Sequence, residues 1–268
     1  MAGARVTISG STVLLTGATG GIGHAIAQAL AHRGARLILT GRRDGVLDDL
    51  AGKLGSRALT CDLASREAVA HLADLAAEAD ILVANAALPA TGLLTDLSQD
   101  QIDRMLEVNL RAPIALARAL APTMISRGSG HMVFISSLSG KAASPASPLY
   151  SATKFGLRGF ALGAREDLRE HGVGVSTVFP GFIRDAGMFA DTGVRLRPGV
   201  GTRSPEDVAA AVLRAIDEDR AETDVAPASL RIGAALAGLA PAAFAAVTRR
   251  LGSHDVAHQM SESQRSHR

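Results

Sequence analysis

Tyr150 and Lys154 are four residues apart in a segment, residues 147–170, whose pattern predicts a helix. At this spacing the two side chains share one helix face. A phenol has an ordinary pKa of about 10, and a neighbouring ammonium favours the phenolate and lowers that pKa. The pair predicts general acid–base catalysis at an alcohol or carbonyl oxygen, although an accidental surface pair would have the same spacing.

Ser137 and Asn109 are the other candidate catalytic residues. Ser137 follows a predicted strand, residues 131–135, so its hydroxyl would lie at the carboxyl edge of a parallel sheet, where ligands bind. The preceding Ser136 is expected only to start the loop. Asn109 lies four residues before Pro113, which has no N–H to donate to the Asn109 carbonyl. We expect a kinked helix there and a free carbonyl that could hold a water; a plain proline kink is the alternative.

A glycine-rich turn, residues 16–23, follows the first predicted strand and opens the first predicted helix. Gly17 would allow a tight turn, Gly21 a close approach of the backbone to phosphates, and Gly23 close packing of helix on sheet. A helix N-terminus with free N–H groups suits a pyrophosphate. The turn predicts a dinucleotide site; a glycine-rich turn without a ligand is the alternative.

The end of the second predicted strand indicates which dinucleotide binds. NAD sites usually place a carboxylate there for the ribose hydroxyls, but this strand ends in Thr40-Gly41-Arg42-Arg43. Two guanidinium groups suit a 2′-phosphate, which favours NADP over NAD unless Arg42 and Arg43 are ordinary surface charges. Asp62, with Leu63, would lie near the adenine, or Asp62 could instead cap the next helix.

Short apolar runs alternate with helical patterns along the chain, which indicates an α/β fold with a doubly wound parallel sheet and helices on both faces. The expected strands are residues 12–15, 36–39, 58–60, 80–83, 131–135, 173–179 and 222–226. The expected helices are residues 21–32, one ending near residue 54, 65–77, 98–127, 147–170, one starting after Ser204, and a helical region at 227–251. Residues 184–203 are rich in glycine, which predicts a lid or, as the alternative, a disordered loop.

Composition limits the remaining possibilities. The 268 residues carry a net charge of +2 and no aromatic-interleaved basic stripe, so nucleic-acid binding is not expected. The lone Cys61 excludes an internal disulfide and suits a reducing compartment. No segment resembles a signal peptide or a membrane span, and no metal site is indicated. We expect one domain over residues 1–251, a disordered tail at 252–268, and a cytoplasmic protein.

These residues together resemble the short-chain dehydrogenase/reductase family in its single-domain form, over residues 11–224. The resemblance implies a Rossmann sheet of about seven strands in the order 3-2-1-4-5-6-7 and hydride transfer to or from NADP. It implies that Tyr150 exchanges the proton, Ser137 steadies the substrate oxygen, Lys154 binds a ribose and Asn109 holds a relay water. The cofactor residues indicated are Gly17, Thr19, Gly20, Gly21, Ile22, Gly23, Arg42, Arg43, Asp62, Leu63, Asn85, Ala86, Tyr150, Lys154, Pro180, Gly181 and Ile183.

The chain departs from the family pattern at two positions near the expected nicotinamide. Ala87 stands where glycine is usual, and Asp185 where threonine is usual. The C-terminal strand common in tetrameric members is missing, so a homodimer through the two long helices or a homotetramer remain alternatives. An apolar pocket is expected to take a hydrophobic ketone or alcohol, lined by Leu138, Ser139, Ala143, Phe182, Met188 and Phe189.

Two other functions remain open on the sequence alone. A catalytically silent dinucleotide sensor acting through a partner would keep the glycine-rich turn, although the intact catalytic set argues against it. An epimerase or dehydratase of the larger related branch would need a longer substrate domain than this chain has room for.

Overall fold

The computed structural model describes residues 6–89, 92–190, 200–242 and 246. These form a seven-stranded, all-parallel sheet in the order β3-β2-β1-β4-β5-β6-β7, as predicted. The strands are β1 (Thr12–Thr16), β2 (Arg36–Gly41), β3 (Arg57–Thr60), β4 (Ile81–Ala84), β5 (Gly130–Ile135), β6 (Val173–Pro180) and β7 (Glu222–Val225). All seven carboxyl ends therefore point to one side, which is where the candidate residues gather.

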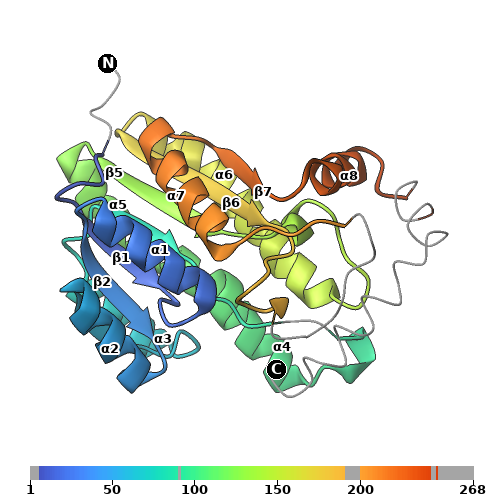
Figure 1. Cartoon of the computed structure of the whole chain (residues 1–268), viewed down its shortest axis with the longest axis horizontal. Helices are drawn as coiled ribbons and strands as arrows, with labels where there is room; N and C mark the ends of the chain where they lie inside the picture. Colours follow the sequence, from blue (N-terminus) through green and yellow to red (C-terminus); the bar gives the residue numbers. More distant parts are fainter. Residues whose placement is uncertain (1–5, 90–91, 191–199, 243–245, 247–268) are drawn as a thin grey trace.

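Helices cover both faces of the sheet (Figure 1). One face packs against α1 (Gly21–His32), α2 (Asp44–Leu54) and α7 (Pro205–Glu218). The other packs against α3 (Arg66–Leu75), α5 (Ala112–Arg127) and α6 (Pro148–Arg169). Side chains alternate along each strand, so Leu15 of β1 joins the first core and Leu14 the second. Two buried faces explain why the strands read as continuous apolar runs.

The helix expected at residues 98–127 is not one uniform α-helix. The structure has α4 (Gln99–Leu106), a π-helical segment η2 (Glu107–Arg111) and then α5. At the place of the expected kink the helix contains a wide turn that ends two residues before Pro113. Such single π turns are rare and occur often at functional sites. At the other end, Ser98 and Gln101 form the predicted capping box.

The two ends of the region between β6 and α7 are joined by a small β-bridge, between Ile183 and Arg203. Arg184 N–H donates to the Arg203 carbonyl at 2.9 Å, and Arg203 N–H donates to the Phe182 carbonyl at 3.0 Å. This bridge closes the base of the segment expected to be a lid, of which residues 191–199 lie outside the described part.

Within the helical region expected at residues 227–251, the structure has α8 (Ala228–Leu239), which projects from the body of the protein in Figure 1, and residues 243–245 and 247–251 lie outside the described part. Two short single-turn helices, η1 (Leu94–Asp96) and η3 (Leu138–Gly140), complete the described elements. The tail predicted at residues 252–268 lies outside the described residues.

Candidate functional site

The glycine-rich turn between β1 and α1 is packed so tightly that its key positions admit no side chain. Gly17 has a φ of +68°, and an added Cβ would lie 2.8 Å from the Ala86 Cα. A Cβ on Gly23 would lie 2.0 Å from the Gly17 carbonyl oxygen. Asn85 holds the turn to β4, because its Nδ2 donates to the carbonyls of Thr16 at 3.1 Å and Gly17 at 3.2 Å.

A cavity of about 690 Å³ opens beside this turn at the carboxyl edge of the sheet. It is lined by the turn, the end of β2, the residues after β3, the segment after β4 and the first part of the expected lid. Twelve of the seventeen predicted cofactor residues line it, namely Gly17, Thr19, Gly20, Gly21, Ile22, Gly23, Arg42, Arg43, Asp62, Leu63, Asn85 and Ala86.

The β2 end of the cavity carries the two arginines. The Arg43 guanidinium donates to the Thr19 carbonyl, which places it directly over the glycine-rich turn. Thr40 also lines the cavity, and its buried hydroxyl finds no hydrogen-bond partner among the described residues. A buried, unpaired hydroxyl on the wall of a cavity with two cationic neighbours fits a polar, phosphate-bearing ligand. The residues present therefore fit a phosphorylated dinucleotide.

Asp62 does not cap the following helix. Ser65 is the N-cap of α3, and its hydroxyl accepts from the Ala68 N–H. The Asp62 carboxylate instead accepts from the Ala64 N–H at 3.1 Å and pairs with Arg104 at 3.2 Å. Asp62 therefore stays on the cavity wall, tied to α4 by Arg104.

Tyr150, Ser137 and Lys154 come together at the carboxyl end of β5. Burial raises the pKa of Tyr150 to about 12, and a hydrogen bond with Ser137 opposes this rise. Ser137 also accepts from the Ser139 N–H at 3.1 Å, so η3 fixes its hydroxyl. The expected lowering of the Tyr150 pKa by Lys154 is wrong for this structure, because desolvation of the phenol outweighs any effect of the ammonium.

Lys154 is fully buried, and its hydrogen-bond acceptor is a backbone carbonyl of β5. Its Nζ donates to the Ile135 carbonyl at 2.9 Å and lies 5.6 Å from the centre of the Tyr150 ring. Burial lowers the pKa of Lys154 to about 8. The helix spacing does place both side chains on one face, but β5 rather than Tyr150 provides the nearest partner of the ammonium.

Asn109 is buried within the π-helical segment, and its side chain has a partner of its own. Its Oδ1 accepts from the Leu88 N–H at 2.7 Å, and its Nδ2 donates to the Leu88 carbonyl at 3.0 Å. Leu88 lies in the segment after β4 that lines the cavity. The sequence assigned a role only to the Asn109 carbonyl, whereas the structure shows that the side chain fixes the cavity wall.

The residues predicted after β6 and after Ser137 lie mostly outside the cavity wall. Pro180 ends β6, Gly181 N–H donates to the Val225 carbonyl at 3.0 Å, and Ile183 is buried in the bridge to Arg203. Among the predicted substrate residues, the rings of Phe182 and Phe189 contact each other with centroids 4.9 Å apart. Leu138 and Ser139 belong to η3, Ala143 lies exposed beyond η3, and Met188 lines the cavity itself.

The first part of the expected lid lies directly on the glycine-rich turn. A Cβ added to Gly21 would lie 2.1 Å from the Ala186 Cβ, so Gly21 is what permits this contact. Asp185 lines the cavity with a φ of +70°, which is unusual for a residue with a side chain. Ala87 also lines the cavity. Both departures from the family pattern therefore face the same space.

The comparisons with known proteins agree with this geometry. A family model described as short chain dehydrogenase matches residues 11–194. The chain belongs to the short-chain dehydrogenase family. It is 34% identical over 228 residues to the "Ketoacyl reductase HetN" of Nostoc sp., covering 82% of this chain and 79% of the relative. Members of this family are oxidoreductases, and this chain is an NAD(P)-dependent enzyme acting on CH–OH groups.

Two solved members of the family are similar over most of their length. One is a short-chain dehydrogenase from Sphingobium yanoikuyae in complex with NADPH, with a TM-score of 0.74, 29% identity, and coverage of 87% of this chain and 96% of that one. The other is a metagenomic short-chain oxidoreductase in complex with NADP, with a TM-score of 0.66, 35% identity, and coverage of 81% and 96%.

Several residues lining the cavity of this short-chain dehydrogenase were missed by the sequence reasoning. The signal for some was present, because they directly follow a strand or flank a chosen residue: Thr40, Gly41, Cys61, Leu88, Pro89 and Val108. Ala186 and Gly187 gave no such signal, since only the folded position of the lid brings them over the turn. Burial raises the pKa of Cys61 to about 11, so its thiol stays protonated and inert at neutral pH.

Across the described residues, no helix combines the length and apolar character that crossing a bilayer requires. The described residues also include no cluster of His, Cys, Asp or Glu side chains able to hold a metal ion.

Proposed function

We propose that the protein interconverts a ketone or aldehyde and the corresponding alcohol with NADP(H), using Tyr150 as the general acid or base. The observation that carries the proposal is the grouping of three side chains at the carboxyl end of β5. There the Ser137 hydroxyl counteracts the rise in the Tyr150 pKa, and the Lys154 Nζ lies 5.6 Å from the centre of the Tyr150 ring. The cavity for the dinucleotide opens at the same edge of the sheet. The similarity to a ketoacyl reductase supports a carbonyl substrate.

The protonation state of Tyr150 favours its acting as an acid on a carbonyl. Because the pKa of Tyr150 is raised to about 12, the phenol holds its proton at neutral pH. The nicotinamide supplies or accepts the hydride when the cofactor is bound. During reduction the Tyr150 Oη–H donates its proton to the substrate oxygen, which Ser137 holds through its hydroxyl. In the reverse direction the phenolate accepts that proton from the alcohol.

Lys154 and Asn109 would support this proton transfer. An ammonium near the ring stabilises the phenolate that forms when Tyr150 gives up its proton. Lys154 would also bind the nicotinamide ribose, and the Asn109 carbonyl would hold a water that replaces the lost proton. Pro180, Gly181, Ile183 and Asp185 would border the nicotinamide end of the site.

NADP(H) is favoured over NAD(H) by the charges at the end of β2. Arg42 and Arg43 line the cavity there, and no carboxylate stands in the Thr40–Arg43 stretch to repel a 2′-phosphate. The two solved relatives, in complex with NADPH and with NADP, support this choice. Apolar side chains dominate the expected substrate side, from Leu138, Phe182, Met188 and Phe189, which suits a hydrophobic ketone or alcohol.

A homodimer through α6 fits the composition of its exposed face. Phe155 and Leu162 remain 41% and 42% exposed, one turn to either side of Gly159. An added Cβ at Gly159 or Gly163 would meet nothing within 4 Å, so packing within this chain does not require either glycine. Glycine in a helix costs about 1 kcal/mol relative to alanine, and close approach of a second helix would offset that cost.

The test is a panel of ketones, aldehydes and alcohols followed by cofactor absorbance, with NADPH and NADH in parallel. Tyr150→Phe is expected to lose turnover while NADPH binding, followed by the fluorescence of the nucleotide, is largely retained. Ser137→Ala is expected to lower kcat more than it changes NADPH binding. Equal activity of Tyr150→Phe and the wild type would overturn the proposal, as would binding of NADPH without turnover of any compound in the panel.

A further inference from the structure

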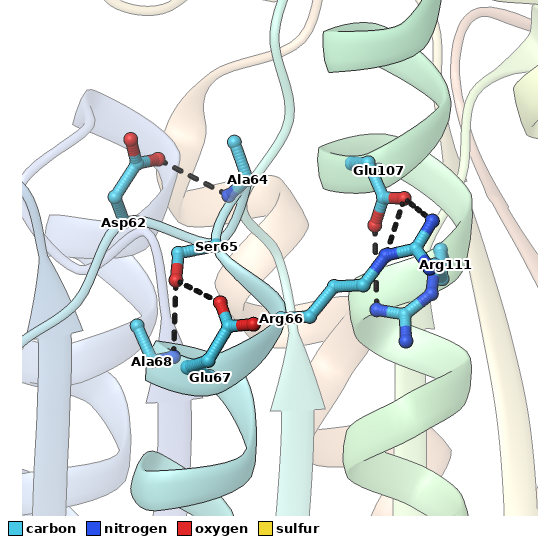
Figure 2. Close-up of polar contacts among 8 residues, drawn as sticks. All are labelled: Asp62, Ala64, Ser65, Arg66, Glu67, Ala68, Glu107 and Arg111. Atoms are coloured by element: carbon cyan, nitrogen blue, oxygen red, sulfur yellow. Dashed lines mark hydrogen bonds and ion pairs between the residues drawn. The ribbon is translucent and has the colours of Figure 1, made fainter.

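Glu107, the first residue of the π-helical segment, is held by two arginines from different elements (Figure 2). Arg66, in the first turn of α3, donates to Glu107 Oε1 from its Nε at 3.1 Å and also from its Nη2. Arg111, one turn further along, donates to Oε2 at 3.3 Å. The Glu107 side chain is only 19% exposed, whereas the Arg66 and Arg111 side chains reach it from the surface and are 64% and 42% exposed.

Arg66, the partner of Glu107, comes from the segment that follows the cavity-lining residues after β3. Arg66 lies four residues after Asp62, a cavity-lining residue, and Ser65 fixes the helix start between them. A second contact runs parallel to the first, from Arg104 of α4 to Asp62. Two ion pairs thus connect the residues after β3 to the helix that leads into the π turn.

Val108 and Asn109, the two residues after Glu107, connect the π turn to the cavity. Val108 lines the cavity wall. Asn109 holds both backbone polar groups of Leu88 through its side chain. Leu88 belongs to the segment Ala86–Pro89, each residue of which lines the cavity. A shift of the turn would therefore move Val108 and release Leu88 together.

A π turn has a poorer intrinsic stability than the α-helix on either side, and it persists where side chains hold it. The turn in η2 contains one residue more than an α-helical turn, and Asn109 faces Leu88 only while that extra residue is kept. Glu107 lies at the first position of that turn, where two N–H groups of Arg66 donate to its Oε1. These charge-assisted hydrogen bonds limit how far the first residue of the turn can move. Regularising the helix would rotate Asn109 away from its partner.

We propose that Glu107, through its hydrogen bonds with Arg66, is a positioning residue that holds the π turn in its observed conformation. Asn109, in the same turn, thereby fixes the cavity-lining segment Ala86–Pro89. Glu107 does not line the cavity, so it acts through Asn109 and Val108 rather than by contact with cofactor or substrate. The consequence for catalysis rests on the proposed function, whereas the consequence for the Leu88 backbone does not.

The test measures amide hydrogen exchange at Leu88 in the cofactor-free protein, together with NADPH binding and steady-state kinetics. The variants are Glu107→Ala, Glu107→Gln and Arg66→Ala. Asp217→Ala is the matched control, since Asp217 accepts two hydrogen bonds from Arg33 between α1 and α7, away from the cavity. Asn109→Ala is the positive control for exchange, because it removes the acceptor of the Leu88 N–H directly.

Glu107→Ala and Arg66→Ala are expected to speed exchange at Leu88 and to weaken NADPH binding about fivefold, while the protein stays folded. Glu107→Gln keeps an oxygen for Arg66 and is expected to recover part of the loss. Asp217→Ala should change neither quantity. Unchanged exchange at Leu88 in both Glu107→Ala and Arg66→Ala would overturn the inference.

Failure of the proposed function would look different. If wild-type protein binds no NADPH and reduces no carbonyl, the proposed function fails, while faster exchange at Leu88 in the variants still supports the positioning role. If the wild type is active and Glu107→Ala lowers activity with unchanged Leu88 exchange, the loss has another cause and the positioning role is wrong.

Discussion

The Asn109 side chain holds Leu88 by both of its backbone polar groups, with the N–H donating to Oδ1 at 2.7 Å and the carbonyl accepting from Nδ2 at 3.0 Å. A carboxamide is the one side chain that offers an acceptor and a donor side by side in this geometry. Asn109 lies in the π-helical segment η2, so both the helix geometry and the carboxamide group contribute to its contact with Leu88.

Asn109→Ala is expected to lower the free energy of unfolding by about 2 kcal/mol, because two partly buried backbone groups of Leu88 lose their partners. Asn109→Asp keeps the acceptor for the N–H but turns an oxygen toward the Leu88 carbonyl, so it should also destabilise the protein. Urea denaturation of both variants and the wild type measures the effect. An alanine variant as stable as the wild type would show that water replaces the side chain at no cost.

The positions of the strands and the parallel sheet were predictable from local patterns, whereas the strand order was implied by the resemblance to the family. Each apolar run bounded by a helical pattern gave one parallel strand, and the crossovers all have helices long enough to return the chain. The glycine-rich turn was equally predictable. Gly17 and Gly23 have no room for a Cβ, so glycine at these positions already indicates that the backbone is closely packed there.

The contacts of Lys154 and Glu107 could not be predicted, because they depend on how separate elements are placed against each other. Spacing put Lys154 beside Tyr150, yet the Ile135 carbonyl of β5 lies nearer to its Nζ and takes its hydrogen bond. Burial, which spacing does not report, then decided the direction of the Tyr150 pKa. The pair of Arg66 and Glu107 joins residues 41 positions apart on two helices that only the fold brings together.

Lys154 should make the stability of the protein increase with pH just above neutrality. Its pKa is about 8 when folded, against an ordinary value of 10.5, so between these values the unfolded chain binds the extra proton. The free energy of unfolding is then expected to rise as the pH increases from about 8. Lys154→Met, which cannot titrate, should show no such rise in urea denaturation between pH 7 and 9.5.

Two other groups titrate at the upper end of that range and act in the opposite direction. Burial raises the pKa of both Cys61 and Tyr150, so each lowers stability once the pH exceeds its ordinary value. Both are present in wild type and variant alike, so the difference between the two curves isolates Lys154. Parallel curves would mean that Lys154 has an ordinary pKa in the folded protein.

His131 should make the protein sensitive to acid. Its ring lies buried between β5 and β6, with Nε2 2.8 Å from the Ser176 hydroxyl. Burial lowers its pKa to about 4, although the Asp219 carboxylate opposes and the Arg165 guanidinium adds to this shift. Since the folded pKa lies below the ordinary 6.5, stability is complete above pH 6.5 and falls as the pH drops toward 4, by up to about 3 kcal/mol.

His131→Gln keeps a polar group for Ser176 but does not titrate, so it is the matched variant. Urea denaturation at several values between pH 4 and 7.5 should give a steeper loss for the wild type than for this variant. Carboxylates that titrate in the same range contribute to both proteins equally. If the two profiles have the same slope, His131 is not the group that senses acid.

Arg42 and Arg43 should set the preference for the phosphorylated dinucleotide. A charge-assisted hydrogen bond to a phosphate is worth about 1.5–3 kcal/mol, so Arg42→Ala is expected to raise the KM for NADPH about tenfold or more and to leave the KM for NADH nearly unchanged. Arg43→Ala should affect both cofactors, because Arg43 also donates to the Thr19 carbonyl on the glycine-rich turn. Lys53→Ala, an exposed cation on α2, is the control.

Leu162 on α6 should be required for self-association if the exposed face with Phe155 and Gly159 forms a dimer. Leu162→Glu places two like charges near the symmetry axis of such a contact, where desolvation and repulsion both oppose pairing. Light scattering coupled to size exclusion is expected to give a monomer for this variant and a dimer or a larger even assembly for the wild type.

Ile232→Glu changes an equally apolar and more exposed position on α8 and should leave the mass unchanged. If Ile232→Glu gives the monomer and Leu162→Glu does not, the chains associate through α8 rather than through α6.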